Sequence, residues 1–235
     1  MSLPFFYKED LDSTATEVVL DEDSSKHMVQ VLRMQNKEQL QLTNGKGDLF
    51  TAEILDNNRK KCAVKILEVQ HIKRTAAKIT LAISLIKNNN RFEWFLEKAT
   101  EIGISNIVPL ICERTEKTVF KSDRMKNILV SAMLQSQQSW LPILQEPAKF
   151  LSFVNQPNSA NKFIAHCENR DTKVQLLSHQ PFTDSTILIG PEGDFSTDEI
   201  TVALQNNFIP VALGNTRLRT ETAGVVAATL LAMAE

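Results

Sequence analysis

The sequence predicts an α/β protein, in which helices cover both faces of a parallel sheet and a small β-rich domain precedes that sheet. From residue 78 on, nearly continuous apolar strands alternate with helical segments, as in parallel strands buried on both faces. Residues 1–72 instead show short alternating strands and turn residues. A hydrophobic fraction of 43% in 235 residues is sufficient for two cores. We therefore expect two domains, residues 1–72 and 73–235.

The first domain is predicted from one hairpin and its neighbours. "EQLQLTNGKGDLFTAEILD" alternates through Leu40 and Leu42 and turns at Asn44-Gly45, a dipeptide that tolerates the positive φ angles of tight hairpin turns. "KKCAVKILEV" supplies a further alternating strand, and "SSKHMVQVLRM" has the apolar spacing of a short helix. These segments predict a small β-barrel with one helix.

The second domain begins with the strand "KITLAISLI" and the helix "NNNRFEWFLEKATEIG". We expect Asn90 to cap this helix, with Glu93 three residues on, and Gly103 to end it. A later helix begins at Ser196, with Glu199 completing a capping box. The other expected elements are strands at 104–111, 162–168, 185–190 and 208–214, and helices at 122–137 and 220–234.

Composition excludes several classes of protein. The start "MSLPFFYKEDLD" has neither the basic nor the apolar region of a signal peptide, and the longest apolar run, 223–234, is too short to span a bilayer. The three cysteines and four histidines lie far apart, so neither a disulfide framework nor a metal site is indicated. We expect a reduced, cytoplasmic protein with no structural metal and no membrane partner.

Charge is distributed unevenly along the chain. Residues 73–127 carry 11 Lys and Arg against 6 Asp and Glu, although the formal net charge of the whole chain is −2. A local basic segment on an acidic chain can contact nucleic-acid phosphates. The alternative is a solvated helix face, which charge alone favours.

Two unusual loops follow strands of the second domain. Gly190–Gly193 follows one strand and Gly214–Thr222 follows the next, and we expect these strands to be adjacent. Loops at the carboxyl edge of a parallel sheet are where α/β proteins bind ligands, and glycines let the backbone approach a ligand closely. Neither loop has the spacing of a phosphate-binding loop. A nucleoside with an adenine edge and an amino-acid tail suits them better; the alternative is that both are only tight turns.

The last helix is apolar on nearly every side from Ala223 to Ala234. A helix of this kind packs against something large, either the sheet or a second subunit. We expect a homodimer.

Four segments carry a resemblance to a known family. "LIGPEGDFSTDEI", "LGNTRLRTETAGVVAATLL", "NNNRFEWFLEKATEIGISNIVPLICERT" and "HMVQVLRMQNKEQLQLTNGKG" resemble segments of the RsmE family of 16S rRNA uridine-N3 methyltransferases, in the SPOUT superfamily, and the combination of the first two is highly specific. The resemblance implies an N-terminal PUA-like RNA-binding barrel and a sheet with a C-terminal trefoil knot that holds S-adenosylmethionine. It also implies a homodimer that acts on a uridine near the decoding region, presented by the assembled small ribosomal subunit.

Most of the expected site residues lie in the segments that resemble the family; Lys87 and His166 lie outside them. Cofactor contacts are expected from Leu188, Ile189, Gly190, Pro191, Glu192, Gly193, Leu213, Gly214, Leu218, Arg219, Thr220, Thr222 and His166. RNA contacts are expected from Arg33, Lys87 and Arg91. The sequence departs from the family at Asp194, where a second glycine is common, and at Gln135–Gln138, which lack an arginine of the family.

Methylation of uracil N3 requires the proton on that nitrogen to leave and the base to be unpaired. Arg219 is the expected stabiliser of the developing uracil oxyanion. Glu221 and Glu192 are the candidate bases, and each can instead brace a loop by accepting backbone amides. Two other functions remain open: an inactive RNA-binding or assembly factor, and a related knotted methyltransferase that acts on transfer RNA or on a ribose hydroxyl.

Overall fold

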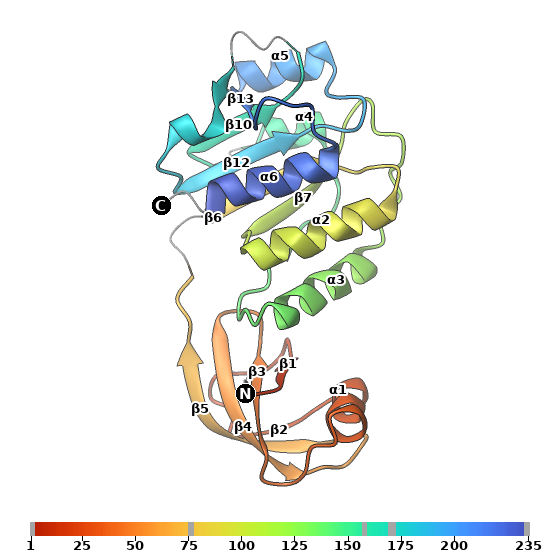
Figure 1. Cartoon of the computed structure of the whole chain (residues 1–235), viewed down its shortest axis with the longest axis vertical. Helices are drawn as coiled ribbons and strands as arrows, with labels where there is room; N and C mark the ends of the chain where they lie inside the picture. The colour runs from red at the N-terminus through yellow and green to blue at the C-terminus, as the bar shows by residue number, and fades with distance from the viewer. Residues whose placement is uncertain (1–2, 75–77, 157–158, 169–172, 233–235) are drawn as a thin grey trace. The chain divides into compact units, whose positions relative to one another are not determined.

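The computed structural model describes residues 3–74, 78–156, 159–168 and 173–232. The chain forms two compact units (Figure 1). Unit 1 comprises Met1–Arg74 together with Met133–Leu141, and unit 2 comprises Thr75–Ala132 together with Pro142–Glu235. Unit 1 therefore includes a segment that lies some sixty residues beyond the predicted boundary.

Unit 1 is a curled five-stranded sheet with one helical segment. The strand order is β1 (Phe5–Tyr7), β3 (Gln39–Thr43), β4 (Asp48–Asp56), β5 (Ala63–His71) and β2 (Glu17–Val19). The predicted hairpin at Asn44-Gly45 joins β3 to β4. The predicted helix is α1 (Glu22–Lys26), which continues as a π-helical turn, η1 (His27–Val31). The sheet is a half-barrel, because β1 and β2 remain at opposite edges of the strand order.

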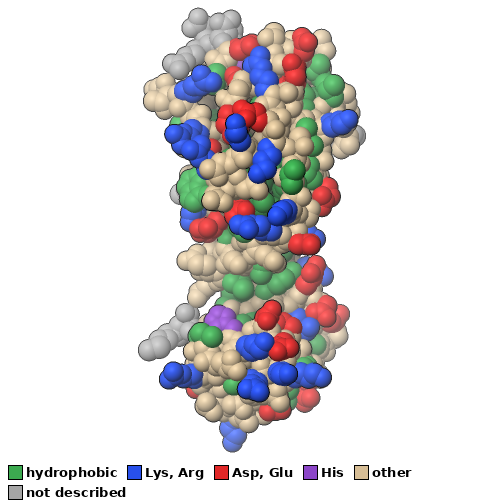
Figure 2. Space-filling view, turned by 90° about the vertical axis from the view of Figure 1, so that its right-hand side faces the viewer, with side chains coloured by type: hydrophobic (Ala, Val, Ile, Leu, Met, Phe, Trp, Pro, Cys, Tyr) green, Lys and Arg blue, Asp and Glu red, His purple; other side chains and the backbone are tan. Residues whose placement is uncertain are grey.

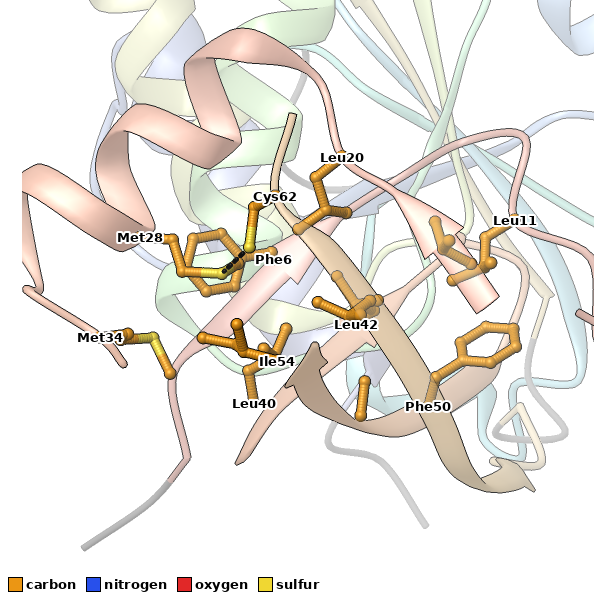
Figure 3. Close-up of a cluster of buried hydrophobic side chains, with 13 residues drawn as sticks. Phe6, Leu11, Leu20, Met28, Met34, Leu40, Leu42, Phe50, Ile54 and Cys62 are labelled. Carbon is orange, nitrogen blue, oxygen red and sulfur yellow. Dashed lines mark hydrogen bonds between the residues drawn. The ribbon is translucent and has the colours of Figure 1, made fainter. Parts of the chain in front are cut away.

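The core of unit 1 lies on the concave side of this sheet (Figure 3). Alternate residues of β3 and β4 point inward, so that Leu40, Leu42 and Phe50 are fully buried. Helical Met28 covers them, and its Sδ lies 3.6 Å from Cys62 Sγ. Since Cys62 is fully buried, it serves here as a small apolar side chain.

The returning segment, Met133–Leu141, closes one side of unit 1. Leu141 N–H donates to Gly45 O at 2.9 Å, and Trp140 Nε1 donates to Ile72 O at 2.8 Å. Gly47 has φ +95°, and a Cβ built there would lie 2.4 Å from Trp140 Cζ2. This glycine is therefore required both by its backbone angle and by the indole that packs on it. Gln135–Gln138 belong to this segment.

Unit 2 contains a parallel sheet, as predicted. Its strand order is β11 (Val174–Gln175), β13 (Ile209–Ala212), β10 (Asn161–Ala165), β12 (Asp184–Ile189), β6 (Lys78–Ser84), β7 (Asn106–Ile111) and β8 (Ile143–Leu144), and β9 (Ala148–Lys149) also pairs with β7. Helices α2 (Asn89–Ile102) and α6 (Thr220–Ala232) pack together over β6 (Figure 1). Helices α4 (Phe150–Val154) and α5 (Thr197–Gln205) enclose a second apolar cluster with Ala82, Val108 and Leu188. The α/β class is thereby confirmed, and the knot stays a prediction.

The strand order corrects one expectation about the two loops. Strands β12 and β13 follow each other in the chain but are not neighbours, because β10 lies between them and pairs with both. The end of β10 is therefore placed between the loops after β12 and β13. Sequence spacing could not show this insertion, since it comes from the order of strands in space.

The helix ends agree with the sequence in most places. Ser196 caps α5 in a complete capping box with Glu199, and Gly103 ends α2 with φ +92°. The predicted cap of α2 was wrong: Asn88, not Asn90, caps this helix by accepting a hydrogen bond from the Asn90 backbone. Helix α3 (Ser122–Gln135) is two residues shorter than predicted. Within the described residues, none of the helices combines the length and the apolar character needed to cross a membrane.

Helix α6 packs tightly at Gly224. A Cβ at this position would lie 2.6 Å from Phe95 Cε2 and 2.8 Å from Ile83 Cδ1, so the glycine allows α6 to approach both α2 and β6. Val225, Val226 and Leu230 remain partly exposed on the outer side of α6. On the face shown in Figure 2, Lys and Arg side chains are interspersed with Asp and Glu.

Candidate functional site

A cavity of about 570 Å³ lies at the carboxyl edge of the unit 2 sheet. Three strand ends form it: Ala165–Cys167 after β10, Ile189–Pro191 after β12, and Val211–Leu218 after β13. Lys173, Gln175, Thr220 and Ala223 complete the lining. The two loops singled out in the sequence thus belong to one site, with the end of β10 as its third wall.

The structure brings many of the predicted cofactor residues together around this cavity. Its lining includes His166, Ile189, Gly190, Pro191, Leu213, Gly214, Leu218 and Thr220. Leu188 lies behind the cavity in the α4–α5 core. Glu192, Arg219 and Thr222 line adjoining hollows, and Gly193 packs against Arg114. The cavity is also lined by residues that are absent from the predicted set, namely Ala165, Cys167, Lys173, Gln175 and Arg217. The position of β10 in the sheet is the signal that would have identified Ala165 and Cys167.

His166 is the polar side chain best suited to a ligand in this cavity. Both of its ring nitrogens are buried, and neither has a hydrogen-bond partner among the described residues. Burial, reinforced by the nearby Lys173 ammonium, lowers the pKa of His166 below its ordinary value. The ring is therefore neutral near pH 7 and offers one N–H donor and one acceptor to a bound molecule.

The Gly190–Asp194 loop is braced by side chains from its neighbours. Asp194 Oδ2 accepts the Cys167 backbone N–H at 2.7 Å, which ties this loop to the end of β10. Arg114, which follows β7, donates to Gly193 O at 2.8 Å and to Phe195 O at 3.3 Å. The loop is thus fixed from two sides of the cavity.

Asp194 has φ +66°, in the left-handed region that favours glycine. This angle explains why a glycine suits the position and why aspartate, which tolerates the region better than most residues, can replace it. Gly190 has a different requirement: a Cβ there would lie 3.1 Å from both the Phe195 amide nitrogen and its ring. Gly214 has φ +142° in open space, so only its backbone conformation demands glycine.

A second hollow of about 460 Å³ adjoins the cavity and contains the predicted catalytic residues. Arg219, Glu192 and Glu221 all line it. The Glu221 side chain is 8% exposed, and Arg91 Nε lies 3.7 Å from its Oε1. Glu192 is exposed, and its Oε1 accepts the Lys87 backbone N–H at 3.0 Å, so this residue braces the loop after β6.

The predicted RNA contacts do not all meet at this site. Arg91 lines the second hollow, whereas the Lys87 ammonium pairs with Glu116 at 2.8 Å. Arg33 belongs to unit 1, where it is exposed and has φ +58°. Within the described parts of the chain, no group of three or more His, Cys, Asp and Glu side chains is arranged to hold a metal ion.

The chain is similar to known RNA methyltransferases along its whole length. Residues 73–232 match the RNA methyltransferase domain family, and residues 20–67 match the RNA methyltransferase PUA domain family. The chain is 30% identical to a ribosomal RNA small subunit methyltransferase E from Buchnera aphidicola, over 97% of this chain and 92% of that protein.

Solved structures agree with this result. A probable rRNA-methyltransferase from Porphyromonas gingivalis is 36% identical, with a TM-score of 0.92 over 99% of this chain and 98% of that one. A ribosomal RNA small subunit methyltransferase E from Neisseria gonorrhoeae, bound to S-adenosyl methionine, is 28% identical, with a TM-score of 0.86 over 96% and 95% of the two chains. The chain therefore belongs to the RNA methyltransferase family that includes the ribosomal RNA small subunit methyltransferases E.

Proposed function

We propose that this protein uses S-adenosylmethionine to methylate N3 of a uridine in 16S rRNA, near the decoding region and within the assembled small subunit in the cytoplasm. The observation that supports it most is the cavity at three strand ends, in which His166 keeps both ring nitrogens buried and without a protein partner. Family membership supports the rRNA substrate, and the resemblance of the two signature loops supports uridine N3.

The cavity suits a nucleoside that bears an amino-acid tail. Gly190, Leu213 and Gly214 line the cavity, and the open space around the Gly214 Cα lets a ligand approach the backbone closely there. Neutral His166 offers both a donor and an acceptor, and Lys173 on the same cavity wall provides a cation for a carboxylate. When bound, S-adenosylmethionine supplies a methyl group on a positively charged sulfur.

Residues of the second hollow then act on the uracil. Transfer of the methyl group to N3 requires the N3 proton to pass to a base, which leaves negative charge on the uracil oxygens until the new N–C bond forms. Arg219 is exposed on the loop beside the cavity, where its guanidinium can meet such an oxygen. Glu221 is the better placed base, since Glu192 already accepts a backbone amide through one oxygen. Arg91 holds the Glu221 carboxylate toward the hollow.

Unit 1 supplies RNA affinity in this proposal and takes no part in the chemistry. Its PUA-domain match and the exposed Arg33 support that role, and Lys87 and Arg91 add contacts from unit 2. For this division of roles, unit 1 is taken as Met1–Arg74 together with Met133–Leu141.

The active form in this proposal is a homodimer. Val225, Val226 and Leu230 leave apolar surface on the outer side of α6, next to Thr222 at the edge of the site. A second copy packed there covers that surface and adjoins both active sites. Sedimentation at micromolar concentration should give about twice the 26.4 kDa chain mass, and a monomer at that concentration would contradict the dimer.

Mass mapping of 16S rRNA tests the activity directly. Purified protein and S-adenosylmethionine are added in parallel to small subunits and to naked rRNA from cells that lack this protein. We expect one methyl group at uracil N3 and faster reaction with the subunits. A methyl group on a ribose or on transfer RNA would instead identify a different methyltransferase, and RNA binding with no cofactor heat in calorimetry would identify an inactive assembly factor.

A further inference from the structure

Trp94 is an exposed tryptophan beside the active site. It lies on α2, where neighbouring Phe92 and Phe95 are buried in the core, yet Trp94 itself is 43% exposed. Among the described residues, no aromatic ring stacks on the indole and no acceptor bonds its N–H. An exposed, unpaired indole keeps a flat apolar face available for a ligand.

Trp94 lines a third hollow of about 570 Å³, which lies between α2 and the loop after β13. The other lining residues are Asn90, Arg91, Arg217, Leu218, Arg219, Glu221 and Thr222. Arg217 and Leu218 also line the cofactor cavity. The third hollow and the cofactor cavity are therefore direct neighbours, with Arg217 and Leu218 in the wall of both.

The charges around this hollow fit an anionic ligand. Arg91, Arg217 and Arg219 bring three guanidinium groups to its wall. The buried Glu221 balances part of this charge through Arg91, while Arg217 and Arg219 are exposed and have no ion-pair partner among the described residues. Guanidinium groups bind phosphate with well-defined geometry.

We propose that this hollow binds the target nucleotide of the RNA, with the Trp94 indole stacked on the unpaired base and Arg217 at its phosphate. A base that leaves an RNA helix loses its stacking neighbours, and an aromatic side chain replaces that contact without regard to sequence. Arg219 and Glu221, the proposed catalytic residues of the second hollow, also line this one, so a base stacked on Trp94 lies beside them and beside the cofactor cavity. This inference rests on the proposed function, since it assigns the substrate subsite of the same reaction.

Steady-state kinetics of the full-length protein on small subunits, with saturating S-adenosylmethionine, test the assignment. The variants are Trp94→Ala, Trp94→Phe and, as a matched control, Leu151→Ala, which removes another large exposed apolar side chain of unit 2. Loss of one base–aromatic stack corresponds to a rise of about five- to 160-fold in KM for the RNA in Trp94→Ala. Trp94→Phe keeps an aromatic face and should recover most of the affinity, and Leu151→Ala should match the wild type. Calorimetric affinity for S-adenosylmethionine should be the same in all four proteins.

Sedimentation of the same proteins separates stacking from subunit contact. If Trp94→Ala becomes monomeric while Trp94→Phe does not, the indole serves a second copy of the chain and the assignment is wrong. A KM for Trp94→Ala equal to that of Leu151→Ala also overturns it. Failure of the wild type to bind the cofactor or to methylate rRNA would refute the proposed function itself, which is a distinct result.

Discussion

Asp194 holds the cofactor loop to the end of β10, and removing its side chain should weaken cofactor binding. Its carboxylate accepts two backbone amides, from Cys167 at 2.7 Å and from Phe195 at 2.9 Å. Asp194→Gly removes both bonds but keeps a residue that favours φ +66°. The effect of this variant is therefore free of added backbone strain.

The expected magnitude follows from these two bonds. A hydrogen bond to a charged group contributes about 1.5–3 kcal/mol when well shielded, and Asp194 is only partly buried. We therefore take the lower end of this range for the two bonds together, about 1.5 kcal/mol, which corresponds to about a twelvefold rise in the dissociation constant for S-adenosylmethionine. Asp194→Ala adds about 1–2 kcal/mol for a left-handed conformation and should lower the melting temperature further.

Calorimetry with S-adenosylmethionine measures this rise. Asp194→Asn keeps a side-chain oxygen and tolerates the same φ, so its affinity should lie between those of the wild type and of Asp194→Gly. Equal affinity for Asp194→Gly and the wild type, with both proteins folded, would show that the bond to Cys167 does not shape the cofactor site.

Four further outcomes follow from the same structure. Arg219→Ala should lower the methyl-transfer rate by a factor of about 10²–10³ with near-normal cofactor affinity. Gly190→Val should abolish cofactor binding, because the Cβ of the new side chain would lie 3.1 Å from Phe195. Calorimetry and single-turnover rates distinguish these two effects. Gly224→Ala should lose about 1–3 kcal/mol of unfolding free energy in urea melts, since its Cβ would meet Phe95 at 2.6 Å, and unchanged stability would show that α6 can shift. Because the pKa of His166 is lower in the folded protein than in the unfolded chain, protonation of this histidine favours unfolding. The free energy of unfolding should therefore decrease as the pH drops below about 6.5, and it should decrease less steeply in His166→Gln. Deletion of residues 1–72 should abolish methylation of subunits but leave cofactor binding; because Met133–Leu141 belong to the same unit, the deletion also replaces residues 133–141 with a short polar linker, and calorimetry with S-adenosylmethionine measures the binding that remains.

Local patterns in the sequence were sufficient for most of the fold. The alternation of Leu40 and Leu42 predicted a strand buried on one face, and the Ser196–Glu199 pair predicted a helix start, because both depend on neighbouring residues. The cap of α2 was misplaced because three consecutive asparagines offer equally good caps, and only the backbone angle of Asn88 decides between them.

The site was predictable where its residues follow the two loops, and among the residues that other elements bring to the cavity only His166 was predicted. Gly190, Pro191 and Leu213 came from the loops themselves. Cys167 depends on the insertion of β10 between β12 and β13, Lys173 on the pairing of β11 with β13, and Arg114 reaches the loop from the end of β7. Trp94 comes from a helix about 120 residues earlier in the chain than the loop it faces. Such contacts arise from strand order and packing, which no local pattern contains.

The discontinuity of unit 1 has a consequence for synthesis of the protein. Trp140 and Leu141 complete the contacts of Gly47 and Gly45, so the first domain to leave the ribosome waits for about sixty more residues before its last segment begins to arrive. Domains commonly fold as units in order from the N-terminus during translation. Here the N-terminal unit can mature only after β6, α2 and β7 have been translated. The unit therefore cannot be transplanted as one continuous cassette, and a chimera that keeps it intact must carry both of its segments.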